Sequence, residues 1–146
     1  MINSKGSSVY FCLMINENEL RLGNYILQKV NTRIIPAKVT HQHFELVKTG
    51  NTKDLFPLTL KAEILEKCGF IENKKYALLP DAREFILVLP IIGNANNEIR
   101  AYIKNNKECF ARAVVNGLTA SNNLYHLHQL QNLCFALTGE ELAIKM

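Results

Sequence analysis

The segment from Leu124 to Leu137 constrains the fold most strongly, because it is the clearest amphipathic helix in the chain. Asn123 is a suitable N-cap, and Thr138-Gly139 is a typical helix stop. At about 100° per residue, one broad arc of this helix is apolar. That arc contains Leu127, Leu130, Leu133, Cys134 and Leu137, with Leu124 and Phe135 at its edge. A core must cover it, so the chain is expected to be globular.

The opposite arc of this helix is unusual because it is polar but uncharged. From Ala113 to Gly139 the sequence contains no Asp, Glu, Lys or Arg. The arc consists of Tyr125, His128, Gln129 and Asn132, whose amide, imidazole and phenol groups make directional hydrogen bonds. One interpretation is that a strand or loop covers these groups and satisfies them internally. A second is that they form a contact surface for a partner chain, a host protein or a second copy in a homodimer. A third is that they line a catalytic pocket.

The composition is that of an ordinary globular protein. The 146 residues are 48% hydrophobic and 21% charged, with a net charge of +4. We predict a flexible N-terminal extension over residues 1–13 and a single α+β domain over residues 14–146. The four cysteines are widely spaced and lie beside apolar residues, which predicts buried, reduced thiols and a cytoplasmic location. Val9 to Ile15 is too short to span a membrane, so no membrane association is expected.

Hydrophobic patterning predicts strands, a helix, more strands and a final helix. Short β-branched runs between Leu20 and Val47 predict strands, including one over His41 to Val47. A helix is expected from an N-cap at Thr59 to Cys68, with Gly69 as its terminator. Two hairpins are expected, one joining Tyr76–Leu79 to Glu84–Leu89 and one joining Ile99–Ile103 to Cys109–Val115 through Asn105-Asn106. The expected class is α+β: antiparallel hairpins forming a small curled sheet with two main helices, the second C-terminal.

Histidine and carboxylate pairs are the candidate chemical sites of the sequence. His126 and His128 lie about 200° apart on a helix, so they cannot bind one metal. On a strand, His41 and His43 share a face and could supply two ligands, although no third ligand is evident. Glu140-Glu141 follows the helix stop and is expected to be solvated. No nucleophile, phosphate-loop, dinucleotide or zinc-protease motif is found, so we expect no catalytic residue, metal or cofactor.

Basic residues cluster in the strand-rich N-terminal part. Between Glu19 and Glu45 every charged side chain is basic, and Tyr25 among them could stack on a base. Lys104 and Lys107 flank a later turn. The predicted nucleic-acid contacts are therefore Arg21, Tyr25, Lys29, Arg33, Lys38, Lys104 and Lys107. The alternative is a generic solvated sheet face.

Three blocks of the sequence resemble a family of small, uncharacterised phage and prophage proteins of Bacteroidetes. The C-terminal block is LYHLHQLQNLCFALTGEEL, over Leu124 to Leu142. NELRLGNYI, over Asn18 to Ile26, is similar to the opening motif, and PLTL at Pro57 with CGF at Cys68 is similar to the middle segment. The chain departs from the family at Cys134, where an aromatic residue is usual. The resemblance carries over no catalytic residues, and it implies a mobile-element gene product acting in a bacterial cytoplasm.

These features lead to three hypotheses. The first is a phage- or prophage-encoded, non-catalytic binding protein that inhibits or modulates a host protein or ribonucleoprotein, such as an anti-CRISPR-type inhibitor of a defence nuclease or its guide RNA. The second is a nucleic-acid-binding accessory protein that uses the basic strand face. The third is a small hydrolase or metal enzyme built on His41 and His43 or on His128.

Overall fold

The computed structural model describes residues 15–75, 82–90, 93–104 and 107–146. The predicted N-terminal extension, the Tyr76–Leu79 strand and Asn105-Asn106 therefore lie outside the described residues. The chain divides into two compact units, Met1–Leu58 and Thr59–Met146. The prediction of one domain over residues 14–146 stays a prediction.

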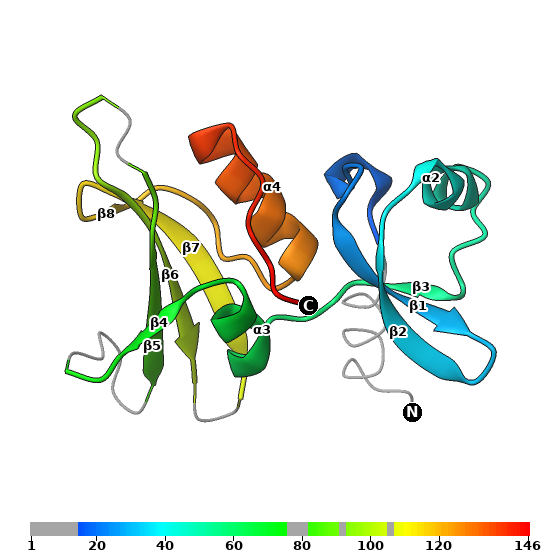
Figure 1. Cartoon of the computed structure of the whole chain (residues 1–146), viewed down its shortest axis with the longest axis horizontal. Helices are drawn as coiled ribbons and strands as arrows, with labels where there is room; N and C mark the ends of the chain where they lie inside the picture. The colour runs from blue at the N-terminus through cyan, green and yellow to red at the C-terminus, as the bar shows by residue number, and fades with distance from the viewer. Residues whose placement is uncertain (1–14, 76–81, 91–92, 105–106) are drawn as a thin grey trace, which may run out of the picture. The chain divides into compact units, whose positions relative to one another are not determined.

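The first unit is a three-stranded antiparallel sheet with one α-helix (Figure 1). Its elements are η1 (Glu17–Glu19), β1 (Tyr25–Val30), β2 (Arg33–Lys38), α2 (His41–Lys48) and β3 (Leu55–Phe56), and the strand order is β2-β1-β3. The core consists of Leu20, Ile26, Val39 and Leu55, and apolar residues of α2 pack against it. Strand β1 is central because both neighbours pair with it, which leaves β2 at an edge.

The predicted strand over His41 to Val47 is wrong, because this segment is the helix α2. Thr40 is its N-cap, and the backbone N–H of Thr40 donates to His43 Nδ1 at 2.9 Å. This is a capping-box arrangement in which histidine stands where Glu or Gln is usual. Phe44 and Val47, one turn apart, then pack on the core. His41 and His43 consequently do not share a face, so their rings do not lie side by side as two metal ligands on a strand would.

His43 links α2 to the sheet and gives this unit a pH dependence. Its Nε2 lies 3.0 Å from Gln28 Oε1, an acceptor, so Nε2 carries the proton and Nδ1 accepts. Burial lowers the pKa of His43 from its ordinary value of 6.5. The unfolded chain therefore binds a proton more readily than the folded one. The stability that His43 contributes is complete above pH 6.5 and is lost as the pH falls toward the lower, folded-state pKa.

We therefore expect the urea midpoint of the first unit to fall between neutral pH and about pH 5. His43→Gln should remove most of this dependence while keeping the fold, because glutamine can accept the same capping bond but does not titrate. His41→Gln is the matched control, since His41 is exposed on the same helix. A pH dependence that is equal in all three proteins would show that another group causes it.

The second unit is a five-stranded antiparallel sheet in the order β4-β5-β6-β7-β8, with α3 and α4 over one face (Figure 1). The helices are α3 (Ala62–Lys67) and α4 (Leu127–Thr138). The strands are β4 (Ile71–Asn73), β5 (Arg83–Val88), β6 (Asn97–Ile103), β7 (Cys109–Val115) and β8 (Leu118–Thr119). The predicted α+β class is confirmed, and so is the β6–β7 hairpin. The predicted curling is not observed, because neither sheet is strongly curled.

The helix-covered face of this sheet is apolar and closely packed. The register aligns Phe85 with Ala101 and Ala111, and Leu87 with Ile99 and Ala113. All of these except Leu87 are essentially inaccessible. A Cβ placed on Gly69, just after α3, would lie 3.8 Å from Leu87 Cδ1, which puts the end of α3 on this face. The alanines leave room for the helices to approach the strands closely.

The helix α3 is shorter than predicted. Its N-cap is Lys61 and not Thr59, which instead forms a bridge with His126. The backbone N–H of Leu60 donates to the Tyr125 carbonyl at 2.9 Å, so this segment extends the sheet before the helix begins. Gly69 follows the helix with a φ of +88°, as expected for a terminator.

Within the described parts of the chain, no helix is long and apolar enough to span a bilayer.

Candidate binding surfaces

The C-terminal helix α4 begins later than predicted but ends where predicted. Its N-cap is His126 and not Asn123. Leu124 is extended and exchanges backbone hydrogen bonds of 2.7 and 2.8 Å with Ala111 of β7. Gly139 has a φ of +73°, and its N–H donates to the Phe135 carbonyl at 2.8 Å. The stop is therefore confirmed, and the start is displaced because the preceding residues pair with a strand.

The buried side of α4 is rotated relative to its apolar arc. Three of the predicted core residues are buried, namely Leu127, Leu130 and Cys134, but His128 and Gln131 are buried with them. Leu133 and Leu137 are only half-buried, and Phe135 is 41% exposed. The expected core arc is therefore confirmed at Leu127, Leu130 and Cys134, and it is only partly buried at Leu133 and Leu137. The extended segment before the helix pairs with β7 and thereby sets the rotation of α4 relative to the sheet. A helical wheel does not include such a tertiary contact, so it cannot predict this rotation.

The four residues predicted as a partner surface do not form one exposed face. His128 is only 1% exposed. Gln129 Oε1 accepts from the backbone N–H groups of Tyr125 at 3.1 Å and His126 at 3.2 Å, so it holds the start of the helix. Tyr125 is 38% exposed and precedes the helix, with its ring 6.3 Å from that of Phe110. Asn132 is half-buried. A partner contact through Tyr125 or Asn132 stays a prediction.

Three of the predicted nucleic-acid residues lie on one face of the first unit's sheet. In the β1–β2 register Tyr25 is opposite Lys38, and Lys29 is opposite Ile34. Side chains alternate along a strand, so Tyr25, Lys29 and Lys38 point away from the side on which Ile26 enters the core. Lys38 Nζ lies 5.5 Å from the centre of the Tyr25 ring. Lys29 and Lys38 are exposed, and neither forms an ion pair with a described residue.

The other predicted cations lie elsewhere. Arg33 is opposite Val30, which places it on the other face of the hairpin. Arg21 precedes β1, and its backbone N–H donates to Asn24 Oδ1 at 2.7 Å. Lys104 and Lys107 belong to the second unit, at the β6–β7 turn. Lys104 Nζ lies 5.3 Å from the Phe110 ring centre and 3.9 Å from Glu108 Oε2.

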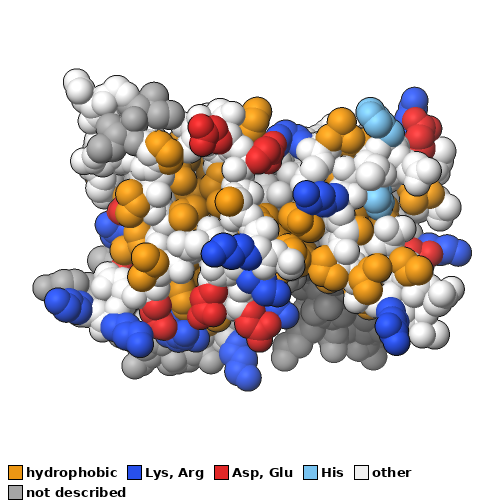
Figure 2. Space-filling model, viewed as in Figure 1, with side chains coloured by type: hydrophobic (Ala, Val, Ile, Leu, Met, Phe, Trp, Pro, Cys, Tyr) orange, Lys and Arg blue, Asp and Glu red, His pale blue; other side chains and the backbone are white. Residues whose placement is uncertain are grey.

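The β1–β2 hairpin also exposes aliphatic side chains that the sequence analysis did not single out. Ile34 is 57% exposed, Ile35 43% and Val30 45%. We call the open face of this hairpin, formed by Tyr25, Lys29, Ile34, Pro36 and Lys38, the hairpin surface. On the face of the molecule in Figure 2, basic side chains are similarly interspersed with hydrophobic ones. A surface of this mixed kind is typical of macromolecular contacts.

Pro36 limits what the free edge of β2 can do. The backbone N–H of Lys29 donates to Asp54, on the β3 side, at 2.8 Å. The pairs Lys29–Ile34 and, by alternation, Leu27–Pro36 are therefore non-hydrogen-bonded pairs of the β1–β2 ladder. The position of the missing N–H of Pro36 thus faces outward, where a further strand would need a donor. A partner is consequently expected to contact side chains of the hairpin surface and not to extend the sheet.

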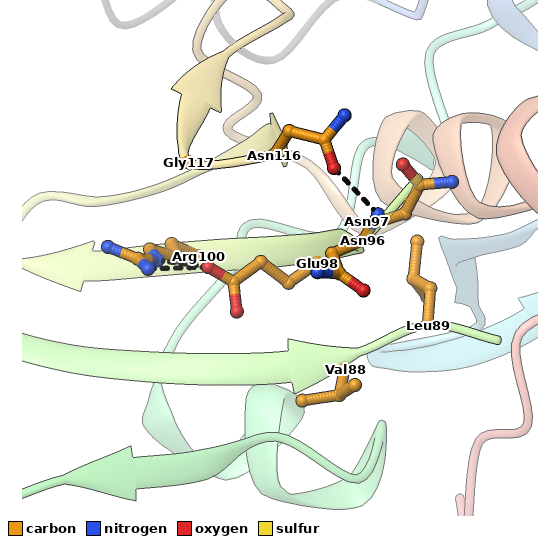
Figure 3. A pocket seen from close by; sticks show the side chains of 8 residues that line it. All are labelled: Val88, Leu89, Asn96, Asn97, Glu98, Arg100, Asn116 and Gly117. Carbon is orange, nitrogen blue, oxygen red and sulfur yellow. Dashed lines mark hydrogen bonds and ion pairs between the residues drawn. The ribbon is translucent and has the colours of Figure 1, made fainter. Parts of the chain in front are cut away.

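The second unit has a hollow of about 400 Å³ where β5 and β7 end and β6 begins (Figure 3). Its lining residues are Val88, Leu89, Asn96, Asn97, Glu98, Arg100, Asn116 and Gly117. Figure 3 shows Glu98 and Arg100 along β6, and Arg100 Nε donates to Glu98 Oε1 at 2.7 Å. The backbone N–H of Asn96 donates to Asn116 Oδ1 at 2.9 Å, which ties the β7–β8 turn to β6. Sequence reasoning missed this hollow because its residues come from three strand ends.

A buried polar cluster lies on the same sheet face as Glu98 and Arg100. Glu84, opposite Tyr102 in the register, is 2% exposed and accepts from Asn73 Nδ2 at 2.9 Å. The Arg112 guanidinium lies over the Tyr102 ring, 5.1 Å from its centre. Burial is the main reason that the pKa of Tyr102 is raised, and the nearby Glu84 carboxylate also raises it. The phenol therefore stays neutral at physiological pH.

Cys68, Cys109 and Cys134 are free and buried, as predicted, whereas Cys12 lies outside the described residues. Burial raises the pKa of Cys68 and Cys134 to about 12 and that of Cys109 to about 11, so these thiols are protonated at neutral pH. Among the described residues, no three His, Cys, Asp or Glu side chains are grouped as metal ligands.

Comparison with known proteins gave no match: no protein-family model, no curated protein and no solved structure corresponds to this chain.

Proposed function

We propose that this chain is a phage- or prophage-encoded, non-catalytic binding protein that modulates a host ribonucleoprotein, with the hairpin surface as its contact for the anionic partner. The observation that carries the proposal is the placement of Tyr25, Lys29 and Lys38 on one open sheet face. The three sequence blocks that resemble small phage and prophage proteins supply the biological context. The cytoplasm of the bacterial host is the proposed location.

The spacing of the two lysines suits a nucleic-acid backbone. Lys38 is opposite Tyr25, and Tyr25 is four residues from Lys29 along β1. The two lysine side chains are therefore about 13 Å apart in the direction of the strands. That is several times the roughly 3.4 Å between successive charges on one strand of a duplex, so the lysines can contact different phosphates. Tyr25 lies beside Lys38, so its ring is placed to stack on a base next to the phosphate that Lys38 contacts.

The aliphatic part of the hairpin surface favours a partner that is not nucleic acid alone. Pro36 lies between the two lysine positions along the hairpin, Ile34 lies opposite Lys29, and both are exposed. Aliphatic side chains gain little from phosphates, but they contribute contact area against protein. A ribonucleoprotein provides both kinds of surface. Binding to nucleic acid alone, as an accessory protein, is the second candidate, and the same lysines support it.

Binding of single-stranded RNA across a salt series tests the proposal. The double variant Lys29→Ala/Lys38→Ala should bind about tenfold or more weakly at low salt. The slope of log affinity against log salt should fall by roughly 1.4, which is two lost phosphate contacts. The matched control is Lys48→Ala/Lys53→Ala, which removes the same charge from exposed positions in the same unit. No binding at low salt, or an equal loss in the control, would contradict the proposal.

A second experiment separates the two candidate partners. The wild-type chain and the Lys29→Ala/Lys38→Ala variant are used to capture partners from the bacterial host, with and without ribonuclease. A protein captured by the wild type, lost with the variant and diminished by ribonuclease supports a ribonucleoprotein. RNA captured without a stoichiometric protein supports the accessory role. Equal capture by both chains would place the contact on another surface.

A further inference from the structure

We infer that the hollow lined by Glu98, Arg100 and the three asparagines of the second unit is a binding site for a neutral nucleobase or nucleoside. Its residues all belong to the second unit, and the inference does not depend on the function proposed for the hairpin surface. The volume of about 400 Å³ is within the range of small-ligand sites.

The charge of the lining residues favours a neutral ligand. Glu98 and Arg100 are the charged residues that line the hollow, and they are paired with each other. Their side chains are about one quarter exposed, at 24% and 26%. Because their charges cancel, the hollow offers no net attraction to a polyanion such as a nucleoside triphosphate. The remaining polar lining consists of neutral amides.

The hydrogen-bonding groups complement a ring that carries an N–H beside a C=O. Arg100 holds Glu98 through Oε1, so the second carboxylate oxygen, Oε2, is left to accept a hydrogen bond. The guanidinium beside it is a donor for a carbonyl. Asn97 also lines the hollow, but side chains alternate along β6, so it projects to the opposite face from Glu98 and Arg100 and is not part of the polar edge that they form.

The apolar part of the lining suits a flat ring. Val88 and Leu89 lie on the β5 side of Glu98, and Asn116 and Gly117 lie on the β7–β8 turn (Figure 3). Gly117 has no side chain to fill the space. A planar heterocycle can lie against the aliphatic side chains while its polar edge meets Glu98 and Arg100. Sugars alone would lack the apolar face that this wall covers.

Ligand-observed NMR and calorimetry with guanosine, uridine, adenosine and ribose test the inference. Guanosine and uridine, whose rings carry an N–H beside a C=O, should bind more tightly than adenosine, and ribose should not bind. Glu98→Gln should weaken guanosine binding by about tenfold or more, because a charge-assisted acceptor is lost. Glu63→Gln is the matched control, since Glu63 is an exposed carboxylate on α3 of the same unit.

The amide NMR spectrum of Glu98→Gln shows whether the fold is retained. If it is not, Val88→Ser provides the second variant, because Val88 is 75% exposed and its loss removes only part of the apolar wall. Absence of binding by all three nucleosides at millimolar concentration would overturn the inference. So would equal binding of ribose and guanosine, or guanosine binding that a folded Glu98→Gln or Val88→Ser leaves unchanged.

Discussion

Leu130→Ala is expected to lower the free energy of unfolding by about 3 kcal/mol, because it removes most of a fully buried side chain and leaves a cavity. Leu130 is 0% exposed and lies on the side of α4 that faces the core. The measurement is urea denaturation followed by circular dichroism. The result also reports the orientation of α4, since a helical wheel would assign the same cost to every leucine of its apolar arc.

Leu133→Ala is the matched control for this orientation. It deletes the same atoms one turn further along α4, at a position that is only half-buried. Its cost should be smaller, about 1 to 2 kcal/mol, because the lost transfer free energy scales with the apolar area removed from water. Equal costs for the two variants, or a larger cost for Leu133→Ala, would contradict the rotated helix and restore the arrangement expected from the sequence.

Ile26→Ala is expected to destabilise the first unit by about 3 kcal/mol while leaving the second unit protected. Ile26 is 0% exposed at the centre of the cluster with Leu20, Val39 and Leu55. The loss combines the transfer free energy of the missing atoms with the cavity that remains. Hydrogen exchange resolved along the chain is the measurement, because it separates local from global opening.

We expect faster exchange in residues 20–58 and unchanged exchange in the five-stranded sheet. The control is Phe85→Ala, the equivalent deletion in the second unit, where Phe85 is 0% exposed. It should show the opposite pattern. If either variant accelerates exchange uniformly along the chain, the two compact units unfold as one. That outcome would support the single cooperative domain predicted from chain length.

The elements that could be predicted from the sequence are those defined by local signals. The stop of α4 at Gly139 follows from a residue that tolerates a φ of +73°. The β6–β7 hairpin follows from two β-branched or aromatic runs separated by Asn-rich turn residues. Helix α2 was missed because its cap uses His43 in place of Glu or Gln, and the helix occupies only eight residues. A strand and a short helix are poorly distinguished at that length.

The candidate surfaces could be predicted only in part, because they depend on register and tertiary contacts. The basic run between Glu19 and Glu45 identified the lysines, but only the pairing of Tyr25 with Lys38 shows that Lys29 shares their face and Arg33 does not. The helical wheel places His128 on the outer arc, whereas the attachment of α4 to the sheet buries it. The hollow near Glu98 joins three strand ends, so no sequence window contains it.

The proline of β2 has a consequence for how this protein behaves at high concentration. A sheet edge that carries Ile34 and Ile35 would otherwise be a template on which copies of the chain could stack and form fibres. Pro36 interrupts the row of outward-facing N–H donors in the middle of that edge. Lys38 adds a positive charge, so copies that stacked edge to edge would bring like charges together. Pro36 and Lys38 therefore oppose edge-to-edge association of copies in the same hairpin whose exposed aliphatic residues suit it for a partner.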